Sequence, residues 1–234
     1  MKDNNGWIVQ PKITTKQYSW NNIQDKYLYL GNLPVTSPQY KSDLFVGLTL
    51  NPIHDKEIKH DCTKLFPLKN NSVIGLQAED VFEHIEYNKI PEIFNEIYRV
   101  LKPDALFRLS LPDYNCPLLR ERSVYDCYGN WLCDLAVGGS VYASFNEKTK
   151  VTFIPGGDSH VWNPTFENVK KLISFSYLKN CQIIKFFHYW ENYTNFVCKP
   201  FEQIIMPVQR TPPKDMRANG APVSIVVDFV KTKI

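Results

Sequence analysis

The sequence predicts an α/β domain built on a mostly parallel sheet, and three observations lead to this prediction. Two short apolar runs, 73–76 and 105–111, lie on either side of an amphipathic segment. The apolar side chains of that segment recur at helical spacing: Ile90, Ile93, Phe94, Ile97, Tyr98 and Leu101. Pro91 suits the first turn of such a helix and Pro103 follows its end. This order of strand, helix and strand is typical of one β-α-β unit in a parallel sheet.

The two strands of this unit differ in composition. Run 73–76 is continuously apolar, as expected for a parallel strand that is buried on both faces. Run 105–111 is interrupted by Arg108 and Ser110. Polar and acidic residues follow both strands, and the carboxyl ends of parallel strands meet at one edge of a sheet. We therefore expect the chemistry of this protein at that edge.

The remaining elements follow from the same kinds of pattern. Apolar runs 27–30 and 43–50 predict two earlier strands, and runs 183–187 and 223–230 predict two closing strands, with a late strand antiparallel to the others. A second helical stripe follows Asn163-Pro164-Thr165, with apolar residues at Phe166, Val169, Leu172 and Ile173.

Length and composition limit the class of protein. The chain has 234 residues, 44% of them apolar and 14% aromatic, which predicts one folded domain over residues 1–234. The net charge is +3 and no Lys/Arg-rich run is present, so long nucleic acids are not expected partners. No apolar run is long enough to span a membrane and the first residues are polar, so we expect a cytoplasmic protein. Six cysteines without a Cys-x-x-Cys pair do not indicate disulfides or a zinc site.

Two segments fall outside the α/β pattern. Residues 1–25 are polar and are expected to be an N-terminal arm that packs on the domain or closes over a cofactor. Residues 114–160 contain Gly138-Gly139, Gly156-Gly157 and many aromatic side chains without a helical period. A long irregular insertion in a compact domain is usually functional, so we predict a cap over the substrate. The alternative is a small surface hairpin.

The amino-acid sequence of the central segment resembles that of a known family. Its residues read Asn-Asn-Ser-Val, then Glu-Asp-Val-Phe-Glu-His-Ile, then Glu-Ile-Tyr-Arg-Val-Leu-Lys-Pro and Leu-Pro-Asp. This order resembles S-adenosylmethionine-dependent methyltransferases with a Rossmann-like fold. It is most similar to the branch, called type 11, that also carries a late His-x-Trp element, here His160-Val161-Trp162. A terminal Asp-x-Arg, here Asp215 and Arg217, fits as well. The resemblance implies a doubly wound, mostly parallel, seven-stranded sheet with a cap insertion.

The resemblance also implies where S-adenosylmethionine binds. Gly31 and Asn32 follow the first strand, where a glycine lets the cofactor approach the backbone. Thr49 ends the second strand, at the position for the ribose hydroxyls, and Asp61 and Cys62 match the adenine position. The cofactor-binding candidates at the end of the fourth strand are Gln77, Glu79 and Asp80.

This chain departs from the family at two of these positions. The family has a glycine-rich loop where only Gly31 stands, and an acidic residue where Thr49 stands. The alternatives are a plain turn at Gly31 and a turn cap at Asp61. One of Glu79 and Asp80 is expected to cap the following turn and the other to line the methyl-donor site.

For the acceptor, the resemblance favours a hydroxyl of a sugar or glycan. Transfer to such a hydroxyl requires removal of its proton, because the pKa of a sugar hydroxyl is high. The candidate bases are His160, Asp113 and Asp158. The candidate substrate-binding residues are Tyr114, Arg122 and Trp162, with Tyr128 and Trp131 as further aromatic platforms. His84 is expected to have a structural role.

We expect no metal ion, because His54 and His60 are not joined by a cluster of carboxylates in the sequence. Two other functions stay open. One is methyl transfer to another small molecule, RNA or protein, and the other is a non-catalytic domain that keeps the fold.

Overall fold

The computed structural model describes residues 18–137, 140–145, 149–154, 156 and 158–233. The predicted glycine pair Gly138-Gly139, the glycine Gly157 and most of the predicted N-terminal arm lie outside the described residues. The described part of the arm packs on the domain. Ile23 is fully buried there, and the Tyr18 hydroxyl donates to the Asp43 carbonyl over 3.1 Å.

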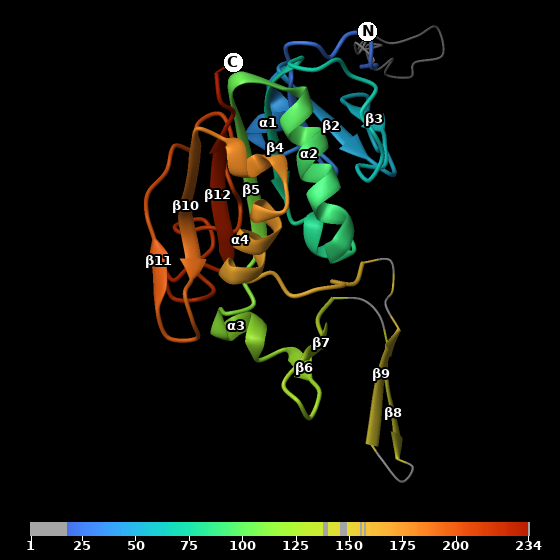
Figure 1. Cartoon of the computed structure of the whole chain (residues 1–234), viewed down its shortest axis with the longest axis vertical. Helices are drawn as coiled ribbons and strands as arrows, with labels where there is room; N and C mark the ends of the chain where they lie inside the picture. The colour runs from blue at the N-terminus through green and yellow to red at the C-terminus, as the bar shows by residue number, and fades with distance from the viewer. Residues whose placement is uncertain (1–17, 138–139, 146–148, 155, 157, 234) are drawn as a thin grey trace, which may run out of the picture.

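One large sheet organises the domain (Figure 1). Its order is β11-β10-β12-β5-β4-β1-β2-β3. The strands are β1 (Tyr27–Leu30), β2 (Phe45–Thr49), β3 (Glu57–Lys59), β4 (Val73–Glu79), β5 (Leu101–Pro112), β10 (Ile183–Trp190), β11 (Phe196–Cys198) and β12 (Ser224–Val230). The pairs among β3, β2, β1, β4 and β5 are parallel, whereas β12 runs antiparallel to both β5 and β10. The predicted sheet class is therefore present, but with eight strands instead of seven, because the short β11 extends the edge beyond β10.

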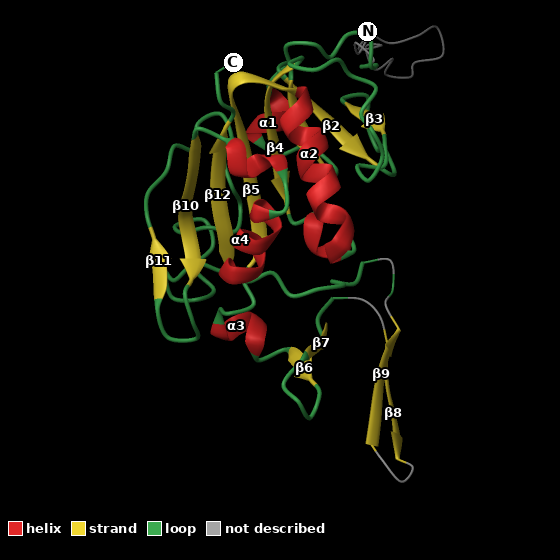
Figure 2. Ribbon diagram, viewed as in Figure 1, coloured by secondary structure: helices red, strands yellow, loops and turns green. Residues whose placement is uncertain are grey.

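One face of the sheet is covered by helices α2 (Ile90–Val100) and α4 (Phe166–Ser174), as Figure 2 shows. Their apolar stripes join alternate residues of β5 and β12 in the main core, among them Phe107, Leu109 and Ile225. The helix α4 begins after Thr165, whose side chain accepts from the Asn168 amide over 3.3 Å, as an N-cap does.

The opposite face carries the four-residue helix α1 (Pro38–Lys41) and an irregular segment that contains Met206 and Val208. Arg108 explains why the β5 sequence is interrupted. Its buried guanidinium forms a bidentate pair with Asp228 at 2.7 Å for both bonds and also donates to the Met206 carbonyl at 2.5 Å. The second face is thus covered mainly by a loop that Arg108 fastens, and not by the long helices that a doubly wound sheet usually has there.

The insertion 114–160 holds short elements only. They are α3 (Pro117–Arg120), β6 (Ser123–Tyr125), β7 (Trp131–Asp134), β8 (Ser140–Phe145) and β9 (Thr149–Ile154). The strands form two antiparallel hairpins, and the β8–β9 hairpin extends away from the sheet in Figure 1. Among the described residues, none of the helices combines the length and the hydropathy that crossing a bilayer requires.

Candidate active site

Two adjoining cavities lie at the carboxyl ends of the central strands. The larger cavity, about 560 Å³, is lined by residues that follow β1, β2, β3 and β4. The second, which we call the polar cavity, is about 350 Å³ and is lined mainly by charged side chains. Asp80, His84 and Asp158 line both. Both volumes fall in the range of ligand-binding pockets, roughly 300–1,000 Å³.

Gly31 lines the larger cavity with bare backbone, because it has no side chain. Its φ is +101°, a conformation that favours glycine, and a Cβ built there would lie 3.3 Å from the Val81 side chain. Asn32 and Thr49 line the cavity next to it. The Thr49 hydroxyl donates to the Asn32 amide oxygen over 3.2 Å, and the Asn32 amide nitrogen contacts Glu57 at 3.3 Å. These hydrogen bonds hold the side chains of Thr49 and Asn32 at the carboxyl end of strand β2.

Asp61 and Cys62 line the far side of the same cavity. One Asp61 oxygen accepts from the Thr63 hydroxyl at 2.7 Å and from the Thr63 amide at 2.9 Å. These bonds, the hydroxyl's first, lower the pKa of Asp61, so its carboxylate is ionised. Burial raises the pKa of the Cys62 thiol to about 12, which keeps it neutral. Asp61 therefore caps a turn and also presents a carboxylate at the cavity wall.

The end of β4 divides its polar residues between the two faces of the sheet. Gln77 and Glu79 line neither cavity, so the structure does not bring these two predicted cofactor contacts to the site. The Gln77 amide donates to the Pro207 carbonyl at 2.9 Å, and Glu79 accepts from the Gln209 amide at 2.6 Å. Successive strand residues face opposite sides, so these two side chains hold the loop on the second face.

Asp80 is the acidic residue that reaches the cavities. Its backbone leaves the strand with φ +54°, and one carboxylate oxygen pairs with Arg210 Nε at 2.9 Å. The other oxygen is buried and accepts no hydrogen bond from the described residues.

Glu83, His84 and His160 converge in the polar cavity. One ligand atom from each lies within 4.8 Å of the others, which is a spacing that can hold a metal ion. The Glu83 carboxylate is 3.9 Å from His84 Nε2 and 3.8 Å from His160 Nε2. The expectation that this chain has no cluster of metal-ligand groups is therefore wrong. The expectation rested on His54 and His60, whereas the histidines that meet are His84 and His160.

Burial shifts the pKa values of two members of this cluster, His160 and Glu83. Burial, and secondarily the electrostatic interaction with His84, lower the pKa of His160 to about 4. Burial, with repulsion from Asp80 as the next cause, raises the pKa of Glu83 well above its usual range. His160 is thus neutral near pH 7.

His160 is held by a buried chain of polar groups. Its Nδ1 lies 2.5 Å from the Tyr114 hydroxyl, which in turn lies 2.6 Å from the Asp134 carboxylate. Asp134 also pairs with Arg122 at 2.8 Å. Tyr114 is 1% exposed and lines neither cavity, so the structure does not bring this predicted substrate contact to the cavities and places it against His160 instead. Arg122 does line the polar cavity, together with Arg210 and Arg217.

Two further predicted residues are structural. Asp113 is fully buried, and its carboxylate accepts from the Trp190 amide at 2.6 Å and the Asn115 amide at 3.0 Å. It joins β5 to β10 and does not face either cavity, which corrects the expectation that it could act as a base. Trp162 packs in the main core and donates its indole N–H to the Phe82 carbonyl at 2.9 Å, so it is not a sugar platform.

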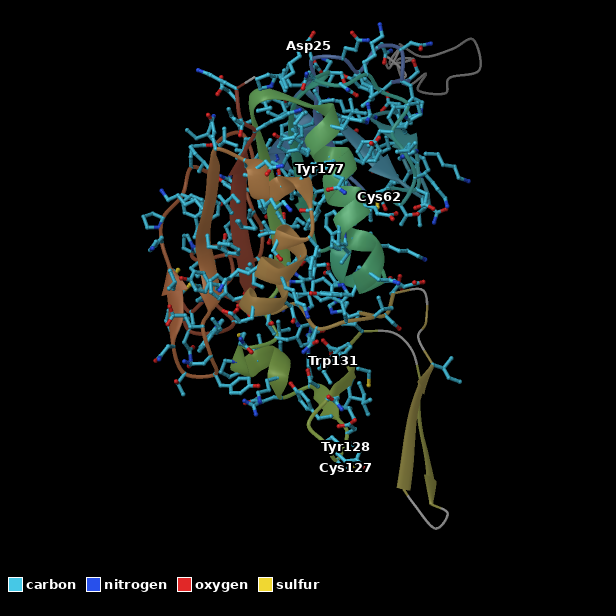
Figure 3. All side chains as sticks on the ribbon, viewed as in Figure 1. Asp25, Cys62, Cys127, Tyr128, Trp131 and Tyr177 are labelled. Carbon is cyan, nitrogen blue, oxygen red and sulfur yellow. The ribbon has the colours of Figure 1, made fainter. Side chains whose placement is uncertain are left out.

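The hairpin aromatics also lie away from the cavities. Tyr128 is 88% exposed near the tip of the β6–β7 hairpin, and Figure 3 shows it beside Cys127 and far from Cys62. Trp131 packs edge-on against Tyr114. Among the described residues, the insertion thus supplies Arg122, Asp134, Asp158 and His160 to the site, and neither Tyr128 nor Trp131 lines a cavity.

Sequence reasoning missed Glu83, Asp134 and Arg210 as members of the site. The adjacent pair Glu83-His84 was a visible signal, because two metal-binding residue types stand directly after a strand end. Asp134 and Arg210 lie in irregular segments whose position the sequence does not predict.

Comparison with known proteins supports the fold. Residues 48–109 match the family model of a methyltransferase domain. No curated protein matches this chain. A SAM-dependent methyltransferase from Archaeoglobus fulgidus aligns with a TM-score of 0.51 and 12% identity, over 89% of this chain and 86% of that one. Another from Methanosarcina mazei aligns with a TM-score of 0.48 and 14% identity, over 90% of this chain and 94% of that one. The chain has the Rossmann-like fold of SAM-dependent methyltransferases, and its segment 48–109 carries the methyltransferase-domain pattern.

Proposed function

We propose that this protein transfers a methyl group from S-adenosylmethionine to a hydroxyl of a polar acceptor, with a sugar or glycan as the first choice. The observation that carries the proposal is the pair of adjoining cavities, which share Asp80, His84 and Asp158. Methyl transfer needs a donor and an acceptor in contact within one enclosed space. The larger cavity suits the nucleoside donor and the polar cavity suits the acceptor.

The residues of the larger cavity fit the cofactor. Gly31 permits close approach to the backbone, and Asp61 and Cys62 can meet the adenine, while Thr49 offers a hydroxyl near the ribose position. The buried oxygen of Asp80 that accepts no hydrogen bond from the described residues suits a positively charged ligand. When bound, S-adenosylmethionine supplies a methyl group on a sulfonium that is already a good leaving centre.

The polar cavity supports a neutral, hydroxyl-rich acceptor. Three arginines in its lining, Arg122, Arg210 and Arg217, are matched by three acids, Asp80, Glu83 and Asp158. A polyanion such as RNA would need an excess of positive charge. A lining of mixed donors and acceptors suits a molecule that offers both, as sugar hydroxyls do.

The transfer itself requires a proton acceptor on the acceptor side. The acceptor oxygen forms a bond to the methyl carbon, the S–CH₃ bond breaks with its electron pair staying on sulfur, and the hydroxyl proton leaves. His160 Nε2 and the Asp158 carboxylate are the two predicted bases that remain at the polar cavity. Asp158 also lines the larger cavity, so it lies where the two reactants meet.

The proposal is tested by binding and by product. S-adenosylhomocysteine is titrated into the purified chain by calorimetry, and methyl transfer from S-adenosylmethionine to a panel of sugars is followed by mass spectrometry. We expect binding with one site per chain and a methylated product that retains the acceptor's carbon skeleton. Failure of S-adenosylhomocysteine to bind contradicts the proposal and favours a non-catalytic domain. Binding together with product only from amine acceptors contradicts O-methylation.

A further inference from the structure

We propose that Glu83, His84 and His160 bind a divalent transition-metal ion in the polar cavity, at its border with the larger cavity. Metal binding itself does not depend on the proposed function. The role that we assign to the ion in methyl transfer rests on that function.

The first argument is that the ligand atoms converge. The carboxylate of Glu83 and the Nε2 atoms of the two histidines fall within 4.8 Å of one another. The three residues come from two segments, 83–84 and 160, which the backbone bond from Val161 N to the Glu83 carbonyl, 2.8 Å long, holds together. The cluster is thus part of the folded framework and not a chance meeting of flexible surface side chains.

The second argument is the orientation of His160. The Tyr114 hydroxyl donates its single proton to the Asp134 carboxylate, which also forms an ion pair with Arg122. The Tyr114 oxygen is then an acceptor for His160 Nδ1–H at 2.5 Å. His160 consequently carries its lone pair on Nε2, directed toward Glu83.

The same holds for His84. Its Nδ1 lies 3.1 Å from the Ser159 carbonyl, which can only accept. Nδ1 therefore carries a proton, and Nε2, 3.9 Å from Glu83, is the ring nitrogen that is left to bind a ligand. Histidines that bind metals almost always donate their other ring N–H to a carbonyl, a carboxylate or a similar acceptor. Both histidines have such a partner.

The third argument is the state of Glu83. It is fully buried, and neither of its carboxylate oxygens accepts a hydrogen bond from the described residues. A buried carboxylate that faces two lone pairs is strongly unfavourable without a compensating positive charge. A bound cation between the three groups provides that charge.

The donor set indicates the class of ion. Two imidazole nitrogens with one carboxylate suit Zn²⁺, Mn²⁺, Fe²⁺ or Co²⁺, and Mg²⁺ and Ca²⁺ prefer all-oxygen surroundings. Three protein ligands leave coordination positions for another molecule. Because His84 lines both cavities, those positions lie where donor and acceptor meet.

An ion at this place assigns separate roles to the two remaining bases. The acceptor hydroxyl coordinates the ion, which lowers the pKa of that hydroxyl. Its proton passes to Asp158, the oxygen electron pair forms the new bond to the methyl carbon, and the electron pair of the broken S–CH₃ bond remains on sulfur. His160 then acts as a ligand and Asp158 as the proton acceptor.

The test measures metal binding without cofactor or acceptor. The full chain is treated with a chelator, freed of it, and titrated with Mn²⁺, Zn²⁺ and Mg²⁺ by calorimetry, with melting temperature as a second readout. We expect one Mn²⁺ or Zn²⁺ per chain, a rise in melting temperature on binding, and much weaker binding of Mg²⁺.

Variants locate the site. Glu83→Gln and His160→Gln should each lower Mn²⁺ affinity at least about 100-fold, and Tyr114→Phe, which removes only the supporting oxygen, roughly 10–100-fold. Glu167→Gln on the exposed face of α4 and His54→Gln outside both cavities are the matched controls, and both should bind as the parent does. In chelator, Glu83→Gln should melt close to the parent, because burial raises the pKa of Glu83 and its metal-free carboxyl is already protonated.

Two results overturn the proposal. One is a folded parent chain that binds none of these ions, and the other is binding that the control variants reduce as much as Glu83→Gln does. The titration of S-adenosylhomocysteine into chelator-treated protein keeps this result separate from the proposed function. Metal binding without cofactor binding refutes methyl transfer alone, and methyl transfer that persists fully in chelator refutes the role of the ion alone.

Discussion

The larger cavity and the polar cavity differ in how the chain assembles them. The larger one is built from the loops directly after strands β1, β2, β3 and β4. The polar one joins the end of β4 to the insertion and to the irregular segment that contains Arg210 and Arg217. Buried polar atoms with no hydrogen-bond partner among the described residues concentrate there: Asp80 Oδ1, both Glu83 oxygens and Arg122 Nε.

This difference indicates where the reactive chemistry lies. A protein that folds for stability alone satisfies its buried polar groups, since each unsatisfied group costs roughly 1–3 kcal/mol. The larger cavity follows that rule nearly throughout, and His60 Nε2 is its main exception besides Asp80. The polar cavity is built around groups that need an external partner. The following predictions test this contrast, beginning with the largest expected effect.

Asp158→Asn tests the border between the cavities. If Asp158 takes the acceptor proton, turnover should fall roughly 10²–10⁴-fold while the affinity for S-adenosylhomocysteine stays near that of the parent. Steady-state kinetics and calorimetry measure the two quantities. A variant that keeps full turnover excludes Asp158 as the base, and a variant that loses cofactor binding assigns it to the larger cavity instead.

Asp113, which lies outside both cavities, should make the stability of the folded state depend on pH. Burial raises its folded-state pKa to about 7, so between pH 4 and about 7 the folded state holds a proton that the unfolded chain releases. Its contribution to stability is present below its unfolded pKa and is lost as pH rises through the folded value. At about 1.4 kcal/mol per pKa unit, the loss is at most about 4 kcal/mol.

Asp113→Asn removes this titration. The parent loses stability as pH rises, and the variant does not. The free energy of unfolding of the variant, measured by urea denaturation from pH 4 to 8, should therefore rise relative to that of the parent. A constant difference across this range contradicts the assignment. Cofactor affinity should be unchanged at every pH, because Asp113 does not face the cavities.

Asp61→Ala tests the wall of the larger cavity. Loss of a hydrogen bond to the adenine amino group should weaken the binding of S-adenosylhomocysteine by roughly 1–3 kcal/mol, about 5–150-fold. Asp61 also caps a turn through Thr63, so Thr63→Val is the matched control that removes one turn bond and keeps the carboxylate. Equal losses in the two variants show that only the turn matters.

Trp162→Phe has the smallest expected effect. It removes the indole N–H that donates to the Phe82 carbonyl and leaves a small cavity in the core. The free energy of unfolding should therefore fall by about 1–2 kcal/mol. Calorimetric melting measures this change. A large rise in KM for a sugar, with unchanged stability, would restore Trp162 to the substrate site.

Much of the region around the larger cavity was predictable from the sequence. The stripe from Ile90 to Leu101 and the two flanking apolar runs predicted the central β-α-β unit, because helix and strand periods are written directly in residue order. Gly31, Asp61 and Asp80 were placed at one edge because strand ends of a parallel sheet meet there. The sequence could not tell which of Gln77, Glu79 and Asp80 reaches that edge. A turn of one residue reverses the face of a side chain, and Asp80 leaves the strand at φ +54°.

By itself, the sequence determined the sheet class, the helix α2 and the residues that follow each central strand, because these depend on local periodicity and strand order. Only the tertiary structure decided which polar residues meet. Asp113 and Trp162 were attractive candidates by residue type, yet long-range hydrogen bonds to Trp190 and Phe82 use them for structure. Glu83 and His160 are 77 positions apart in the sequence, and Tyr114 and Asp134 orient His160 from an insertion without a period. Contacts of that kind depend on how loops pack, which residue order does not encode locally.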